Sequence, residues 1–396
     1  MVAVQDIELE WSEQAEIVRY CIKNRKSLCE VLIDRGLSYD DFKYYHKIQV
    51  GNDGGQYKSI ENFSVHSNGI PVASFFSGCG GLDLGFEAAG FEHAVCIDNN
   101  ELFCNTLRVN RPKWKVIGPP DSAGDVSDRN RLHKELKQYI SSNFDGVFIG
   151  GPPCQPFSIA ANQRFTKDDS NFKRVGFSHK TYGNLIFDFI WFIKKFKPKA
   201  FLIENVPGLA IDGGKKLGQA LSVLSNIGYS VSGPRVLDAI TYGVPQYRKR
   251  LFIIGSLRGT FIFPQPVGKK VPCYKALRLP SRAKNHITRK HTAESIKRYM
   301  MLGCGERDQL GRVDRLNPNL PSNTVIAGGT RGGGRSHLHP LIPRTLSVRE
   351  CARLQTFPDS FVFGGSAARQ FTQVGNAVPP VLAYHLASSL AQQAFS

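Results

Sequence analysis

Hydrophobic residues between positions 71 and 255 form short apolar runs that alternate with longer amphipathic segments. The runs "PVASFF", "HAVCID", "FDGVFIG", "KAFLIENV" and "RKRLFIIGS" predict strands, and "GGLDLGFEAAG", "NELFCNTLRVN", "NLIFDFIWFIKKFKP" and "LGQALSVLSNIG" predict helices between them. This alternation is typical of an α/β fold with a doubly wound, mostly parallel sheet. Sheets of this kind bind their ligands at the carboxyl ends of the strands.

The flanking regions show different patterns. Residues 11 to 46 have apolar positions at helical spacing with Gly36 as a stop, and residues 51 to 69 are rich in Gly, Asn and Ser. From 256 to about 345 the alternation ends, and two further helices are predicted in "SVRECARLQTF" and "NAVPPVLAYHLASSLAQQAF". We therefore expect a helical extension and linker at 1–70, an α/β domain at 71–255 plus 376–396, and a smaller domain with a hinge at 256–375.

The charge of the chain is concentrated in the smaller domain. The whole sequence of 396 residues carries a net charge of +18. Residues 256 to 345 hold 17 Lys and Arg against 4 Asp and Glu (17 − 4 = +13), whereas residues 1 to 70 hold 8 against 11 (8 − 11 = −3). Such local concentration favours a nucleic acid partner over a uniformly basic solvated surface.

Membrane attachment, disulfides and metal binding are not expected from the sequence. No apolar run approaches the length of a membrane span, and the N-terminus lacks the apolar core of a signal peptide, which indicates a cytoplasmic protein. The nine cysteines are odd in number and include no CxxC pair. A disulfide framework or a zinc site is therefore not predicted.

A glycine-rich turn after the first strand, in "FFSGCGGLDLGF", predicts a cofactor site. Gly78, Gly80 and Gly81 let the backbone turn tightly and approach a ligand. Asp98 ends the next strand, where an acid suits ribose hydroxyls, and Asp125 suits an adenine amino group. The turn departs from the dinucleotide fingerprint at Asp83 and has no P-loop lysine. These features favour a nucleoside without a pyrophosphate, and we expect S-adenosylmethionine.

A second turn, "GGPPCQPFS" at 150–158, follows another strand. Prolines 152, 153 and 156 restrict its backbone, so the turn presents Cys154 instead of burying it. The long polar segment 158–182 that follows is interpreted as a lid that closes on DNA, with a disordered surface loop as the alternative.

Six motifs in sequence order carry a family resemblance: "FFSGCGG", "GGPPCQPFS", "ENV", "QYRKR", "RECARLQTFPD" and "QVGNAVPP". With them the chain resembles the DNA (cytosine-5)-methyltransferases of prokaryotic restriction-modification systems from about residue 71 to 396, and residues 1–70 lie outside the resemblance. It implies the fold of S-adenosylmethionine-dependent methyltransferases. It also implies that the basic insert is a target recognition domain, which selects the DNA sequence.

The resemblance assigns roles to individual residues. It implies that Cys154 is the nucleophile, that Glu204 of "ENV" holds the cytosine N3 and amino group, and that Arg248 and Arg250 of "QYRKR" orient the active site. The residues implied to hold the cofactor are Phe76, Ser77, Gly78, Gly80, Gly81, Leu82, Asp98, Asn99, Asp125, Val126, Pro152, Leu185, Asn376 and Val378. Two positions depart from the family pattern: Asn99 replaces a bulkier residue, and "TYGNL" lacks an arginine before its glycine.

The implied activity is methyl transfer to C5 of cytosine in a specific double-stranded DNA sequence. The nucleophile adds to C6 of a base that is flipped out of the duplex. A monomer that is functionally paired with a restriction endonuclease is expected. Two alternatives stay open at this point: a tRNA cytosine-5 methyltransferase, and a catalytically idle DNA-binding regulator.

Overall fold

The computed structural model describes residues 9–64, 66–153, 185–212, 214–280, 282–311, 313–327 and 336–396. Its main sheet has seven strands in the order β3-β2-β1-β4-β5-β7-β6. The pairs from β3 to β5 are parallel, and β7 runs antiparallel to both of its neighbours. The prediction of a doubly wound, mostly parallel α/β sheet is confirmed. The strands are β1 (Pro71–Phe75), β2 (Glu92–Ile97), β3 (Val116–Ile117), β4 (Val147–Gly150), β5 (Ala200–Asn205), β6 (Ser230–Asp238) and β7 (Lys249–Ser256).

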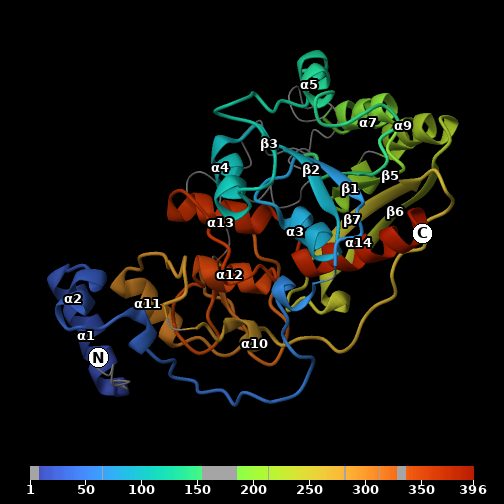
Figure 1. Cartoon of the computed structure of the whole chain (residues 1–396). Helices are drawn as coiled ribbons and strands as arrows, with labels where there is room; N and C mark the ends of the chain where they lie inside the picture. Colours follow the sequence, from blue (N-terminus) through green and yellow to red (C-terminus); the bar gives the residue numbers. More distant parts are fainter. Residues whose placement is uncertain are drawn as a thin grey trace.

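Helices cover both faces of this sheet (Figure 1). The helices of this part are α3 (Gly81–Ala88), α4 (Glu101–Asn110), α5 (Arg129–Leu136), α7 (Leu185–Phe196), α8 (Gly208–Asp212), α9 (Gly214–Asn226), the 3₁₀ helix η5 (Ala239–Tyr242) and α14 (Pro380–Ala394). No helix among the described ranges is both long and apolar enough to cross a membrane.

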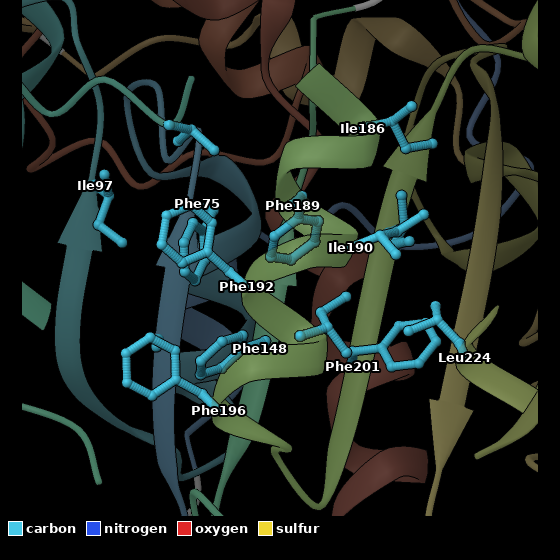
Figure 2. Packing of buried hydrophobic residues seen from close by; sticks show 14 of the residues in the cluster. Phe75, Ile97, Phe148, Ile186, Phe189, Ile190, Phe192, Phe196, Phe201 and Leu224 are labelled. Carbon is cyan, nitrogen blue, oxygen red and sulfur yellow. The ribbon is translucent and has the colours of Figure 1, made fainter. Parts of the chain in front are cut away.

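The two faces of the sheet have separate cores. On one face, Phe75, Phe148 and Phe201 pack with α5, α7 and α9, and the ring centroids of Phe75 and Phe189 of α7 are 4.9 Å apart (Figure 2). On the other face, Val72 and Leu202 pack with α3 and α14. Because side chains alternate along a strand, each buried strand contributes to both cores. The sheet is thus held rigidly enough to position the turns at its strand ends.

Several elements of the sheet domain were not predicted from the sequence. They include the short strand β3, the strand β6, the helices α5 and α8 and the 3₁₀ helix η5, and helix α13 (Ala367–Asn376) of the neighbouring segment was not predicted either. The last helix also begins later than predicted: residues 377–379 are extended, and α14 starts at Pro380. Proline favours the first turn of a helix because its missing N–H would have no partner there.

A second lobe lies beside the sheet domain (Figure 1). Its elements are α10 (Cys273–Leu277), α11 (Ala293–Met300), β8 (Val313–Arg315), β9 (Ser336–Leu338) and α12 (Val348–Leu354). The chain does not enter this lobe directly after β7, because Phe261 and Phe263 still pack in the core that contains α14. The N-terminal helices α1 (Trp11–Asn24) and α2 (Leu28–Asp34) lie against α11, followed by the 3₁₀ helices η1 (Tyr39–Asp41) and η2 (Ile60–Asn62).

Candidate active site and cofactor site

The glycine-rich turn connects β1 to α3 through left-handed backbone conformations, which glycine adopts readily and which are unusual for Phe76. Phe76, Gly78 and Gly80 all have positive φ angles of 56°, 57° and 86°. A Cβ atom on Gly78 would meet only the Phe76 carbonyl, 4.0 Å away, so space is open beside this residue. A Cβ on Gly80 would lie 2.8 Å from Leu107 Cδ2, which shows that the turn packs closely on α4. Among the described surroundings of these two glycines, the open space therefore lies beside Gly78.

Asp98 fastens this turn to the carboxyl end of β2. Its Oδ2 accepts a hydrogen bond from the Gly78 amide at 2.9 Å, and its Oδ1 accepts one from Asn100 at 2.8 Å. Burial raises the pKa of Asp98 to about 6, although both amides favour its ionised form. Each carboxylate oxygen has a second acceptor position. The side chain can therefore hold the turn and accept from a ribose at once.

The predicted adenine-binding residues lie against the same strand end. Gly124 has a φ of 58°, and a Cβ there would overlap the Asp98 carbonyl oxygen. The next residue, Asp125, is partly exposed and accepts from the Ser127 amide at 2.9 Å, while Val126 is buried. The structure thus brings the Asp125 loop next to Asp98.

The C-terminal motif packs on the opposite side of the glycine turn. A Cβ on Gly81 would lie 2.9 Å from Ala377 Cβ and would overlap the Val378 carbonyl. Val378 is buried and packs in one core with Leu82, whereas Asn376 is exposed. This contact requires glycine at position 81 and joins the predicted residues of two distant motifs.

The remaining predicted cofactor residues are distributed around this centre. Ser77 is buried, and its hydroxyl accepts from the Ile97 amide at 3.2 Å. Leu185 is buried at the start of α7, and the Phe76 ring meets the Phe189 ring of that helix edge-on at 6.2 Å. Asn99 is exposed.

Glu204 lies at the carboxyl end of β5 in a buried ion pair. Its Oε1 is 2.9 Å from Arg250 Nε, and the side chains of both residues are nearly buried. Burial raises the pKa of Glu204 and outweighs the opposing attraction of Arg250 and Arg248. A carboxyl group with a raised pKa can hold a proton and donate it to a ring nitrogen.

The turn that leads to Cys154 is held beside this carboxyl group. A Cβ on Gly151 would lie 3.0 Å from Glu204 Oε2. The side chain of Asn205 donates to the carbonyl of the buried Pro152 at 3.1 Å. Cys154 and the segment 158–182 lie outside the described residues. The structure therefore brings the start of the cysteine turn to Glu204.

Arg248 makes different contacts from Arg250. It is 1% exposed, and its guanidinium donates to the carbonyls of Val325 at 3.0 Å, Gly375 at 2.7 Å and Ala377 at 2.8 Å. This side chain ties β7 to the second lobe and to the C-terminal motif. Its charge also opposes the burial effect on the pKa of Glu204, so Arg248 acts on the active site as well as on the packing around it.

Two residues of the quoted motifs were not assigned roles from the sequence. Asn205 follows Glu204 in "ENV", and its contact with Pro152 depends on the adjacent ends of β4 and β5. Gln246 opens "QYRKR", is fully buried, and accepts from the Val325 amide at 2.8 Å. For both residues, the sequence signal that could have indicated a structural role was an amide side chain in a motif next to apolar residues.

One further polar cluster lies below the glycine turn. Asp83 Oδ1 is 3.2 Å from His93 Nε2 and 3.6 Å from Cys96 Sγ, and the His93 ring stacks on Trp114 at 3.8 Å. Burial and Asp83 raise the pKa of the Cys96 thiol, which favours its protonated form as a hydrogen-bond donor. The eight cysteines within the described ranges are all free thiols.

The sheet order and the glycine turn are those of an S-adenosylmethionine-dependent methyltransferase fold. Comparisons with known proteins lead to the same class. The model of the C-5 cytosine-specific DNA methylase family matches residues 70–392. The chain belongs to this family and is a DNA (cytosine-5)-methyltransferase. Its match includes both the sheet domain and the second lobe.

Relatives of known class cover most of the chain. The Type II methyltransferase M.PspPI of Psychrobacter sp. is 33% identical over 358 residues, covering 82% of this chain and 79% of the relative. The Type II methyltransferase M.Eco47II of Escherichia coli is 32% identical over 399 residues, covering 91% and 89%.

Solved structures share the fold. A prophage-encoded E. coli protein described as a DNA modification methyltransferase superposes with a TM-score of 0.66 at 25% identity, covering 82% of this chain and 99% of that one. The S. pombe Dnmt2 methyltransferase has a TM-score of 0.58 at 18% identity, covering 82% and 98%. The second likeness concerns the fold alone.

Proposed function

We propose that this enzyme methylates C5 of cytosine within one specific double-stranded DNA sequence, as the protective methyltransferase of a restriction-modification system. The observation that carries the proposal is the Glu204–Arg250 pair at the end of β5, with Gly151 and Pro152 of the cysteine turn held against it. The names of the Type II relatives support the biological setting. A restriction endonuclease with the same recognition site and a monomeric enzyme are parts of this proposal.

The residues around the glycine turn fit S-adenosylmethionine. The open space at Gly78 admits a ligand close to the backbone, and Asp98 has free acceptor positions for ribose hydroxyls. The Asp125 loop packs against Asp98, so Asp125 can accept a hydrogen bond from the adenine amino group of the same nucleoside. When bound, the cofactor supplies an electrophilic methyl group on a sulfonium sulfur.

The chemistry at cytosine requires a nucleophile and an acid. The thiolate of Cys154 adds to C6, and a proton from Glu204 neutralises the charge that develops at N3. This addition makes C5 nucleophilic enough to take the methyl group. The C5 hydrogen then leaves as a proton to solvent, and the C6–sulfur bond breaks to release Cys154 as a thiolate. N3 returns its proton to Glu204, which restores the neutral base and the acid. Arg250 holds the Glu204 carboxyl in place throughout.

The local structure suits these steps. The raised pKa of Glu204 favours a proton on the side chain that must donate it. The hydrogen bond from Asn205 to Pro152 fixes the backbone two residues before Cys154. A turn held in this way limits the orientations open to the nucleophile, which favours its productive angle of attack.

The activity is tested by sequencing bisulfite-treated DNA from cells that express the enzyme. We expect 5-methylcytosine at a single sequence motif, and no methylation with Cys154→Ala. Transfer of a labelled methyl group to tRNA but not to duplex DNA would show that the substrate is tRNA. Absence of transfer to either would indicate the idle regulator.

The covalent step is tested with duplex DNA that carries 5-fluorocytosine at the target. Fluorine cannot leave C5 as a cation, so the enzyme should stop after methyl transfer with the DNA bound to Cys154. The adduct should require the cofactor, survive denaturing electrophoresis and map by mass spectrometry to the peptide "GGPPCQPFS". Linkage through another cysteine, or normal turnover of the fluorinated DNA, would refute this mechanism.

A further inference from the structure

The N-terminal extension, residues 9–62, lies outside the matched family region and has no part in the mechanism above. It nevertheless shares a hydrophobic core with the second lobe. The buried residues of this shared core are Ile17, Val18, Cys21, Leu28, Val31, Leu32 and Phe42 from the extension, and Ala293, Ile296, Tyr299, Met300, Val313 and Leu338 from the lobe. The lobe residues come from α11, β8 and β9, so the extension completes the core of the lobe.

A charged network crosses this interface. Arg344 is 2% exposed and pairs with Asp40 of the extension through Nε. Its two terminal nitrogens donate to the Glu350 carboxylate of α12, each at 2.8 Å. His286 Nε2 lies 3.4 Å from the second oxygen of Asp40. Asp40 therefore joins the extension to the helix that carries the "RECARLQTF" motif.

The residues after Asp40 continue this attachment. The Tyr44 hydroxyl donates to the His339 carbonyl at 2.9 Å, and the Arg315 guanidinium lies 3.6 Å from the centre of the Tyr44 ring. Arg315 also donates to the His46 carbonyl at 3.0 Å. Strands β8 and β9 form a small two-stranded sheet, in which Arg315 ends β8 and His339 directly follows β9. Tyr44 therefore contacts the carboxyl ends of both strands.

The start of the predicted linker at 51–69 is also bonded to the second lobe. Lys275 Nζ of α10 donates to the carbonyls of Asn52, Gly54 and Gly55 at 3.2–3.4 Å. The segment then reaches the sheet domain, where Ile60 packs in the core of α3 and α14. The extension is therefore attached to both halves of the molecule (Figure 1).

The small sheet connects the extension to the active-site side of the lobe. Asp314 of β8 binds His337 of β9 at 2.9 Å and the Asn323 side chain at 2.8 Å. His337 also bonds the Thr324 carbonyl at 3.0 Å. The next residue, Val325, offers its carbonyl to Arg248 of the sheet domain. Contacts therefore run continuously from Asp40 to the base of β7.

We propose that the N-terminal extension is a positioning element of the target recognition lobe, and that Asp40 and Tyr44 hold β8 and β9 in register with the active site. The inference rests on the proposed function, because it assigns DNA site selection to this lobe. The extension itself carries a net charge of −3 over residues 1–70, which disfavours direct phosphate binding. Its effect on DNA is therefore exerted through the lobe.

The test compares Asp40→Asn and Tyr44→Phe with the matched control Asp41→Asn. Asp41 accepts from the Ser38 amide at 2.7 Å, a contact within the extension. In Asp40→Asn, Arg344 keeps its pairing with Glu350, so no buried charge is stranded. Each variant methylates a randomised duplex library, and bisulfite sequencing reports which sites are modified. Calorimetry with S-adenosylhomocysteine reports the cofactor site separately.

We expect Asp40→Asn and Tyr44→Phe to reduce discrimination between the preferred site and its single-base variants by roughly 2- to 30-fold, the range of coupling between connected sites. Cofactor affinity should stay within about twofold, and Asp41→Asn should match the wild type. Unchanged site preference in both test variants would overturn the inference, as would losses of DNA and cofactor binding that track the folded fraction alone. A wild-type enzyme that methylates no library member would instead refute the proposed function.

Discussion

Asp98 fastens the glycine turn, and under the proposed function it also binds the cofactor ribose. The raised pKa of Asp98 makes this second role testable. Burial raises this pKa to about 6, and the ionised form suits the donating hydroxyls of a ribose. Cofactor binding should therefore be constant above pH 7 and weaken below pH 6, by up to about tenfold per pH unit. Calorimetry with S-adenosylhomocysteine between pH 5 and 8 measures this.

The control for this experiment is Asp98→Asn, which should bind more weakly and lose the pH dependence. The same slope in both proteins would mean that another group titrates. Acid unfolding through Asp98 does not explain the expected loss. Because its folded pKa lies above its unfolded value, its ionisation costs stability above about pH 6, and the cost disappears below about pH 4.

Under the proposed mechanism, Glu204 is the second residue whose function depends on its proton. Glu204→Gln keeps the shape and an acceptor for Arg250 but removes the transferable proton. We expect kcat to fall by about 10²- to 10⁴-fold, with DNA binding retained. Single-turnover transfer of a labelled methyl group measures the step. Glu87→Gln, which alters an ion pair with Arg111 outside the site, should leave the rate unchanged.

At the level of helices and strands, close packing between elements decides which glycines are required. Gly85 lies in α3, and a Cβ there would be 2.6 Å from the Pro380 carbonyl of α14 and would overlap Ala383. Gly85→Ala should lower the free energy of unfolding by about 1–3 kcal/mol, because overpacking outweighs the better helix propensity. Denaturant unfolding measures the change.

The matched control lies in α9. Gly218 is exposed, and a Cβ there would meet nothing within 4 Å. Gly218→Ala should therefore raise stability by about 0.5–1 kcal/mol through its helix propensity. Equal effects at both positions would show that propensity alone determines the outcome.

The contrast between these elements also shows what the sequence could predict. Strands β1, β2, β4, β5 and β7 are apolar runs bounded by turns, and they were predicted correctly. Strand β6 was missed because only two of its nine residues, "SVSGPRVLD", are fully buried, and because it contains a Gly-Pro pair. An edge strand tolerates these residues, but they are also typical of loops.

The candidate site was predictable to a similar extent. The glycine turn, Asp98 and Glu204 stand at or directly after strand ends, so their positions follow from the fold. The contacts of Arg248 could not be predicted, because its partners lie 77 to 129 residues away in the chain. The hydrogen bonds of residues 52–55 to Lys275 of α10 could not be predicted for the same reason, because the composition of this segment alone resembles that of a free linker.

At the scale of the whole molecule, the two arginines of "QYRKR" make different kinds of contact. Arg248 donates to three carbonyls that belong to the second lobe and to the C-terminal motif, whereas Arg250 pairs with Glu204. The planar guanidinium can serve several acceptors at once, but a lysine ammonium is a point charge on a flexible stem. The same substitution should therefore have different effects at the two positions.

We expect Arg248→Lys to lower the free energy of unfolding by roughly 2–5 kcal/mol, the loss of one or two charge-assisted hydrogen bonds. It should also weaken cofactor binding, because the Gly375–Val378 segment it holds packs on Gly81 of the glycine turn. Arg250→Lys should lower kcat with little change in stability or cofactor affinity. Its side chain pairs with Glu204 and otherwise donates to the carbonyl of its neighbour Lys249, so in the described contacts it joins no distant segment other than β5. Denaturant unfolding, calorimetry and single-turnover rates on both variants distinguish these roles. If Arg248→Lys retained its stability and lost only kcat, Arg248 would act on the chemistry directly and would not serve to join the two lobes.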